Sequence, residues 1–310
     1  MFLFEMTNLP HPIQYQGSKR NLAPDILKFL PDRVENLVEP FAGTAAVSIA
    51  AASKSIFQRF WLNDLNQPLI ELLELIIERP NEIADAYTEI WNEQHYDSIN
   101  HYFQVRNKFN ETNDPTLFLY LLTRCVKGSV RYNSAGLFNQ SPDKRRKGTR
   151  PEKMRKNIEG VSQLLKGKCK FTYLDYREVL AEVKTHEFVY LDPPYQGVCE
   201  NKDSRYLAGI NFDDFVLAIE EMMRKKVAFA ISYDGKRGNK IFGNSLPAEL
   251  GLKKIEIEVG RSSQATLLGR KEITVESLYL SPNLLNGQIF SLNSYIKRAP
   301  KQLTILEKHG

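Results

Sequence analysis

The stretch Glu187–Tyr195 constrains the fold of this chain more than any other. Its largely apolar start predicts a buried strand, and it ends in Asp192, Pro193, Pro194 and Tyr195. The prolines fix their own φ angles and Pro193 keeps Asp192 out of the helical region, so the turn is rigid. Ligands of open α/β sheets bind at the carboxyl ends of strands. We therefore expect a carboxylate and carbonyl oxygens that hold an amino group while a ring stacks on its base. A strand that merely ends in a proline turn is the alternative.

A second strand and turn, Asn36–Thr44, precedes the small-residue helix Ala45–Ala52. The strand ends at Glu39, and Phe41 and Gly43 lie in the tight turn that follows. This pattern is typical of the first βα turn of a doubly wound fold, where a helix N-terminus faces a ligand. The turn lacks the Gly-x-Gly-x-x-Gly pattern, which disfavours a dinucleotide.

Asp64 ends the next predicted strand, Phe60–Asp64, about 20 residues after the glycine turn, a spacing typical of nucleoside-binding sites. There an acid accepts hydrogen bonds from ribose hydroxyls. As the alternative, Asp64 caps the helix expected after Pro68. A short glycine turn, Gln14–Lys19, lies near the N-terminus and carries an aromatic ring and a lysine, which alone is a weak signal.

The excess positive charge lies in one segment. The chain has 42 Lys and Arg and 37 Asp and Glu, a net charge of +5. Residues Arg124–Lys156 hold eleven of the basic and two of the acidic residues, which leaves 31 against 35 elsewhere. A local basic excess is typical of a polyanion-binding surface, although such a run can also be ordinary solvated surface.

Cysteine usage indicates a reducing compartment. Cys125, Cys169 and Cys199 are widely spaced, without a Cys-x-x-Cys pair, and the histidines include no His-Glu-x-x-His. This pattern argues against a disulfide framework and a zinc site. No apolar run is long enough to span a membrane, and the first residues do not resemble a signal peptide. We expect a soluble cytoplasmic protein with no metal and no membrane partner.

Residues 69–160 interrupt the alternation of strands and helices. Apolar residues recur every three to four positions over Leu69–Glu78, Ile83–Trp91, Tyr96–Phe109 and Thr116–Val126, which predicts four helices. Aromatic, amide and basic residues then mix in Arg131–Asn139 and are followed by the basic run Lys144–Lys147. This composition suits a nucleic-acid loop, with a flexible charged linker as the alternative.

The alternation resumes after this insertion. The predicted elements are strand Lys170–Tyr173, the strand into Asp192, helix Asp213–Lys225, strand Val227–Ser232 and a hairpin of Ile255–Val259 with Ile273–Tyr279. We predict a discontinuous α/β catalytic domain (1–68 and 161–285), a target-recognition insertion (69–160) and a C-terminal tail (286–310).

In this order the motifs resemble those of the Dam-type (α-class, D12) DNA adenine-N6 methyltransferases, over about residues 13–280. The resemblance implies a Rossmann-like S-adenosylmethionine-dependent methyltransferase sheet of seven strands with a final antiparallel hairpin. It also implies a helical target-recognition insertion, double-stranded DNA as partner, and methyl transfer to N6 of a flipped adenine. A cognate restriction endonuclease is left open as a second partner, as are the recognition sequence and the oligomeric state.

The resemblance also assigns roles to residues. The implied catalytic residues are Asp192, Pro193, Pro194 and Tyr195. The implied cofactor-binding residues are Tyr15, Gly17, Lys19, Glu39, Phe41, Gly43, Asp64, Asp175 and Asp192. The implied DNA-binding residues are Arg131, Tyr132, Asn133, Lys144, Arg145, Arg146 and Lys147.

Two departures from the family pattern concern the cofactor turns. Gln14 stands where many relatives have lysine, and Ala45 replaces a second glycine. The first can remove a contact, and the second affects how closely the backbone approaches the cofactor. Two other functions stay open: methylation of RNA adenine or of cytosine N4, and a catalytically silent DNA-binding subunit of a modification complex.

Overall fold

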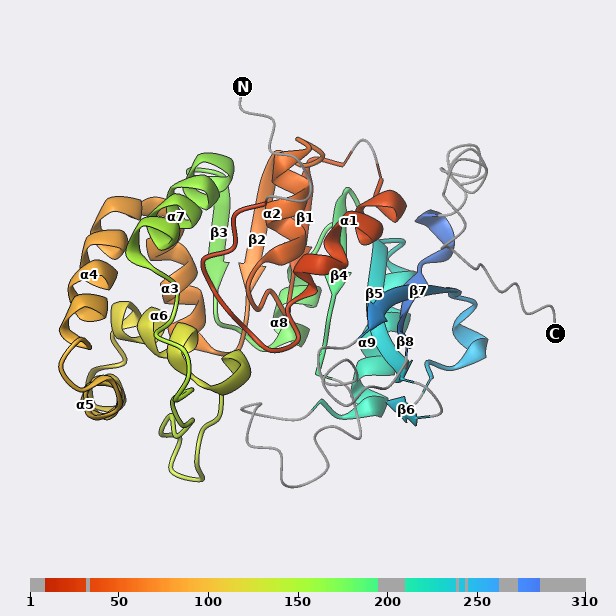
Figure 1. Cartoon of the computed structure of the whole chain (residues 1–310). Coiled ribbons are helices and arrows are strands. Elements are labelled where there is room, and N and C mark those ends of the chain that lie inside the picture. The colour runs from red at the N-terminus through yellow and green to blue at the C-terminus, as the bar shows by residue number, and fades with distance from the viewer. Residues whose placement is uncertain are drawn as a thin grey trace.

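Five parallel strands form the centre of the molecule (Figure 1). Their order is β3 (Cys169–Thr172), β2 (Arg59–Asn63), β1 (Asn36–Glu39), β4 (Glu187–Leu191) and β5 (Ala228–Arg237). The antiparallel hairpin of β7 (Lys253–Arg261) and β8 (Ile273–Leu280) continues the sheet from β5 through β8. The expected sheet of seven strands with a final antiparallel hairpin is confirmed, and a short β6 (Lys240–Phe242) pairs with β5 as an addition.

The structure is a computed structural model that describes residues 9–31, 34–194, 210–237, 240–242, 245–261 and 273–284. Its α-helices are α1 (Ala23–Ile26), α2 (Ala46–Ser53), α3 (Gln67–Glu78), α4 (Pro80–Glu93), α5 (Ser98–Thr112), α6 (Pro115–Arg124), α7 (Pro151–Leu165), α8 (Tyr176–Glu182) and α9 (Phe212–Arg224). The helices predicted from periodicity are confirmed within a few residues. Helices α7 and α8 are additions, and the buried Met154, Ile158, Val161 and Leu165 give α7 the periodicity that could have predicted it.

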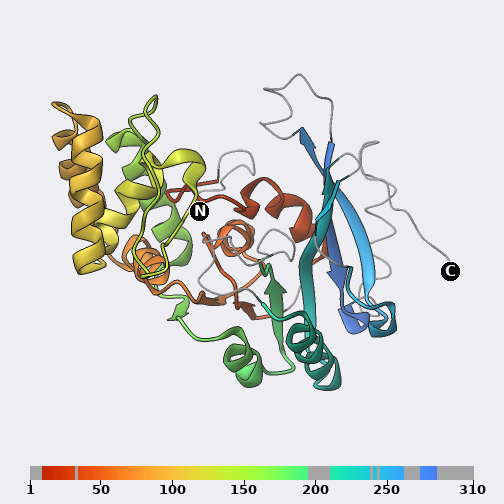
Figure 2. The ribbon, with the colours of Figure 1, turned by 90° about the horizontal axis from the view of Figure 1, so that it is seen from below.

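Helices cover both faces of the sheet because successive strand residues point to opposite sides. Leu37, Phe60 and Phe188 pack with α1, α2, α3 and α7 in one apolar core. Val38 and Val189 pack with α8 and α9 in a second core on the other face. Figure 2 shows α8 and α9 together on one side of the sheet, with α1 and α2 on the opposite side.

The strand order reverses between β1 and β4, which leaves a crevice at their carboxyl ends. Strands β1, β2 and β3 follow one direction across the sheet, and β4 and β5 follow the other. A loop that leaves β1 therefore diverges from one that leaves β4, and the space between them is open to a ligand.

Helices α3 to α7 form a group beside β3 (Figure 1). The side chain of Arg124 is buried inside this group and donates to the carbonyls of Ser98 (3.2 Å) and Asp143 (3.0 Å). Helix α7 packs against both α2 and α4, so it joins the helical group to the sheet. The division at residues 68 and 160 stays a prediction, and the tail 286–310 lies outside the described residues. Among the described residues, no helix is long and apolar enough to cross a bilayer.

Candidate active site

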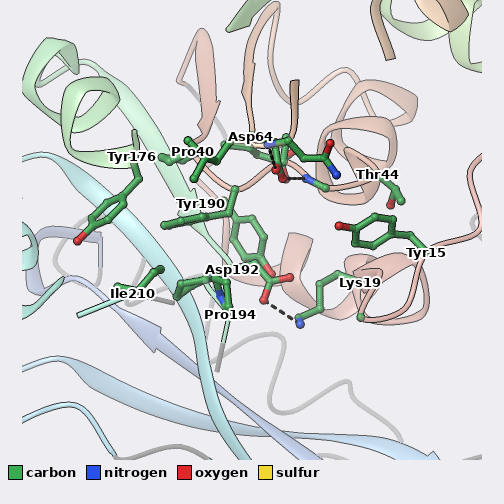
Figure 3. Close-up of a pocket in the computed structure, with 18 of the residues that line it drawn as sticks. Tyr15, Lys19, Pro40, Thr44, Asp64, Tyr176, Tyr190, Asp192, Pro194 and Ile210 are labelled. Atoms are coloured by element: carbon green, nitrogen blue, oxygen red, sulfur yellow. Dashed lines mark hydrogen bonds and ion pairs between the residues drawn. The ribbon is translucent and has the colours of Figure 1, made fainter. Parts of the chain in front are cut away.

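A cavity of about 500 Å³ opens at the carboxyl ends of β1, β2 and β4 (Figure 3). This volume lies within the usual range for small-molecule sites. The cavity brings together every residue expected to bind a cofactor, namely Tyr15, Gly17, Lys19, Glu39, Phe41, Gly43, Asp64, Asp175 and Asp192. Residues that lie far apart in the chain therefore line one cavity, although their individual roles stay predictions.

Asp192 follows β4 directly and is largely buried, with 19% of its side chain exposed. Its Oδ1 lies 2.8 Å from Nζ of Lys19. Burial raises the pKa of the Asp192 carboxyl to about 6, and the Lys19 ammonium opposes this rise. Pro193 and Pro194 also line the cavity, whereas Tyr195 lies outside the described residues.

Lys19 reaches Asp192 from a turn on the other side of the cavity (Figure 3). The turn contains Gly17 at φ +90°, a conformation that favours glycine. Ser18 shares a hydrogen bond of 2.8 Å with the hydroxyl of Thr44, which fixes the turn to the loop before α2. Lys19 is itself buried, so its ammonium is directed into the protein and not into solvent.

Glu39 ends β1 beneath the first residues of α2. Its carboxylate accepts hydrogen bonds from the backbone N–H (2.8 Å) and the hydroxyl of Ser48, so it caps this helix from the neighbouring strand. Burial raises the pKa of Glu39 to about 8 despite these hydrogen bonds, and the charge of Asp192 adds to the rise. Two buried carboxyl groups thus interact across the cavity.

Asp64 connects the two βα turns. Its Oδ2 accepts from the backbone N–H of Gly43 (3.0 Å), and its Oδ1 accepts from the N–H of Asn66 (3.0 Å). Burial raises its pKa. The N-cap residue of α3 is Asn66, so Asp64 is not the helix cap but holds the residue that begins the helix. The expected contact with ribose hydroxyls stays a prediction.

Two aromatic rings that pack together, Phe41 and Tyr176, also line the cavity. The rings of Phe41 and Tyr176 lie 5.2 Å apart between centroids. Beside them Asp175 caps α8 and pairs with Arg177 (2.9 Å), which lowers the pKa of Asp175. In Figure 3 the Tyr176 and Tyr15 rings lie at opposite sides of the cavity.

The loop Arg131–Asn139 forms a small hairpin beside the cavity. Tyr132 pairs with Phe138 across it, is buried, and donates its hydroxyl to the amide oxygen of Asn66 (3.3 Å). Arg131 and Asn133 are exposed, and Asn133 accepts two backbone N–H groups at the hairpin tip. Tyr132 therefore belongs to the cavity wall, while its neighbours face solvent.

The basic run lies on the surface. Lys144, Arg145, Arg146 and Lys147 are all exposed, and Arg146 lies 3.6 Å from Asp143. Arg124 contributes to the basic count of this segment but is buried, so the exposed positive charge is smaller than the sequence suggests. A DNA contact by the run stays a prediction.

Tyr190 and Glu276 are among the cavity-lining residues that the sequence does not predict. Tyr190 lies within β4 and reads as a core residue, yet its hydroxyl shares a hydrogen bond of 2.7 Å with Ser232. Glu276 lies on β8, with Oε2 at 3.3 Å from Nζ of Lys19. A single acid within the predicted strand Ile273–Tyr279 was its only signal.

Within the part of the chain that the structure describes, no group of three His, Cys, Asp or Glu side chains is arranged to hold a metal ion.

The chain is similar to proteins of one family. A family model for D12 class N6 adenine-specific DNA methyltransferases matches residues 15–254. A DNA adenine methylase of Escherichia coli is 32% identical over 188 residues, 59% of this chain and 64% of that protein. The type II methyltransferase M1.LlaDCHI of Lactococcus lactis subsp. cremoris is 28% identical over 221 residues, 67% of this chain and 74% of that protein. The chain thus spans somewhat less than two thirds of the Escherichia coli relative.

We predict that Glu39→Gln makes the free energy of unfolding less dependent on pH. The folded-state pKa of about 8 exceeds the ordinary value of 4.5, so the folded protein holds this proton more tightly than the unfolded chain. The stabilising contribution of Glu39 is therefore complete below the ordinary value and is lost as the pH rises through the folded-state value. Glutamine keeps an acceptor for Ser48 without titrating.

Urea unfolding from about pH 5 to about pH 8 measures this difference. The Glu39→Gln variant should lose less stability than the wild type over this range, and the exposed-acid control Glu82→Gln should follow the wild type. Parallel curves for Glu39→Gln and the wild type would contradict the prediction.

Proposed function

Because the chain belongs to the D12 class of N6 adenine-specific DNA methyltransferases, we propose that it transfers a methyl group from S-adenosylmethionine to N6 of an adenine in double-stranded DNA. The proposal rests chiefly on Asp192, a largely buried carboxylate at the carboxyl end of β4 beside two cavity-lining prolines. A carboxylate in this position is suited to accept a hydrogen bond from an exocyclic amino group.

The cavity is chemically suited to this cofactor. Asp192 offers a carboxylate to a positively charged ligand, and Asp64 offers oxygen atoms to ribose hydroxyls. Tyr15 and Phe41 supply aromatic surface for a base. When bound, S-adenosylmethionine supplies a methyl group already activated on a sulfonium, so the protein need not form a covalent intermediate.

The residues at the end of β4 would act on the adenine amino group, which is a poor nucleophile because its lone pair is delocalised into the ring. The Asp192 carboxylate and the Pro193 carbonyl would accept the two N6 hydrogens and favour a pyramidal nitrogen. The same oxygens would stabilise the positive charge that develops on N6. Tyr195 would stack on the base, and the remaining contribution is positioning.

The target base must leave the duplex, since N6 within the stack cannot reach the cavity. The hairpin Arg131–Asn139 is rooted at the cavity through Tyr132 and presents Arg131 and Asn133 to solvent. We assign it to the space that the flipped base vacates, and we assign the basic run to the phosphate backbone, where contacts position without reading sequence.

A protein partner is suggested by one relative. The Lactococcus lactis relative is a type II methyltransferase. A cognate restriction endonuclease as partner and a cytoplasmic location both stay predictions.

Methylation of random duplex DNA by the purified protein tests the proposal. N6-methyladenine at a defined sequence supports it and gives the recognition site. Methylation of structured RNA or of cytosine N4 would replace the proposed substrate. Binding of DNA without any methyl transfer would favour the silent-subunit alternative.

Asp192→Ala should lower kcat by about 10²–10³, the usual cost of losing one group that stabilises a transition state. Binding of duplex DNA and the folded structure should persist, because Asp192 contacts Lys19 at the cavity and not the basic run. Single-turnover methylation and a gel-shift titration measure both, with Asp85→Ala in the helical group as control. Retention of more than about a tenth of kcat would argue against the assigned role.

Asp64→Asn should raise KM for S-adenosylmethionine about tenfold to a hundredfold, because hydrogen bonds to a charged acceptor are strong. Saturating cofactor should restore most of kcat. Thermal unfolding belongs in the same experiment, since Asp64 also holds the N–H groups of Gly43 and Asn66. An unchanged KM would restrict Asp64 to this structural role.

Replacing Arg145, Arg146 and Lys147 together with alanine should weaken binding to cognate and unrelated duplexes alike. The log–log salt slope should become shallower by up to about 2.7, at roughly 0.9 per phosphate contact. The control variant replaces the exposed Lys166, Lys168 and Lys184, which precede the amino ends of β3 and β4, whereas the cavity opens at the carboxyl ends.

Salt titrations of both variants on both duplexes separate the outcomes. An unchanged slope for the Arg145–Lys147 variant would make the run ordinary solvated surface. A loss confined to cognate DNA would mean that an arginine reads a base, at about 1–3 kcal/mol per good contact.

A further inference from the structure

The ammonium of Lys19 lies between two carboxylates from different strands. Its Nζ is 2.8 Å from Asp192 Oδ1 and 3.3 Å from Glu276 Oε2. All three side chains are largely buried, with exposed fractions of 8% for Lys19, 19% for Asp192 and 21% for Glu276. The proposed reaction gives Asp192 a role but leaves the second carboxylate unexplained.

The sheet is built to bring Glu276 close. Glu276 on β8 pairs with Gly235 on β5, just past a bulge between Ser232 and Gly235. A Cβ on residue 235 would lie 2.8 Å from the carbonyl oxygen of Val275 and 3.9 Å from Cγ of Glu276. Only glycine therefore allows β8 to approach this closely at the residue that contacts Lys19.

A second carboxylate restricts the position of the Lys19 ammonium further than one carboxylate does. A lysine ammonium is a point charge on a flexible stem, and with one partner it can pair with either carboxylate oxygen. Glu276 supplies a second carboxylate, from β8, at 3.3 Å from the same Nζ. The ion pair then uses Oδ1, and Oδ2 is left to accept from an amino group.

We propose that Glu276 is a positioning residue for methyl transfer, which fixes the Lys19 ammonium on Oδ1 of Asp192 and thereby the orientation of the reactive carboxylate. This inference rests on the proposed function. Glu276 acts through Lys19 and does not itself contact the adenine.

The charges around Asp192 give the proposal a specific signature. The charged groups that face Asp192 in the described structure are Lys19 from the N-terminal turn, Glu276 from β8 and Glu39 from β1. Lys19 lowers the pKa of Asp192, whereas Glu276 raises it. Glu276→Gln should therefore lower the pKa of Asp192 and also lower kcat, while Lys19→Met should raise the pKa.

The pH dependence of single-turnover methylation tests both effects. For Glu276→Gln we expect kcat to fall about tenfold, as for a slightly misplaced reactive group, with KM for DNA and cofactor unchanged. The acidic limb of the profile should move to lower pH in Glu276→Gln and to higher pH in Lys19→Met. Glu256→Gln is the matched control, because Glu256 is ion-paired to Lys236 (2.9 Å) on the same part of the sheet but does not line the cavity.

A ¹³C NMR titration of aspartate carboxyl carbons gives a readout without turnover. The Asp192 resonance, assigned with Asp192→Asn, should titrate at lower pH in Glu276→Gln. If that variant does not fold, Glu276→Asp keeps the charge on a shorter side chain and should lower kcat with little change in the acidic limb. Wild-type kcat in the folded variant, or an unmoved Asp192 titration in Glu276→Gln, would overturn the inference. A wild type that methylates nothing would instead refute the proposed function, while the NMR titration would still test the coupling.

Discussion

The burial of three carboxyl groups around one cavity is the constraint on which the rest of this structure depends. Glu39, Asp64 and Asp192 follow three neighbouring strands at the point where the strand order reverses. A buried carboxylate is costly unless it is paired or hydrogen-bonded. Each therefore has a donor: Ser48 for Glu39, the Gly43 and Asn66 N–H groups for Asp64, and Lys19 for Asp192. Burial nevertheless raises the pKa of all three carboxyl groups.

The same constraint links the helical group to the sheet. The hydroxyl of Tyr132 donates to Asn66, the N–H of Asn66 donates to Asp64, and Asp64 also accepts from Gly43. A continuous chain of hydrogen bonds thus runs from the hairpin to the turn before α2. In hydrogen-bond networks of this kind the loss of one member affects the others, so the hairpin and the cavity are parts of one unit.

The turn between β1 and α2, which lines the cavity, contains two residues in the left-handed region of φ and ψ. Gly43 and Ala45 both have positive φ, +51° and +53°. An alanine in the left-handed region costs about 1–2 kcal/mol more than a glycine there. Ala45 therefore adopts a conformation that favours glycine. Its methyl group is fully buried, which offsets part of the cost.

The sequence by itself determined the fold class and the main elements of the site. Apolar patterns in the sequence predicted β1, β2, β4 and most helices. The residues that the motifs assigned to the cofactor all line one cavity. These signals are local, because strand ends and turns are encoded in short stretches of chain. Only the tertiary structure decided which distant residues meet. It pairs Glu276 with Lys19, and it buries the side chains of Tyr132 and Arg124. Such contacts join residues far apart in the chain, and only the register of β8 against β5 and the packing of α6 fix which side chains meet.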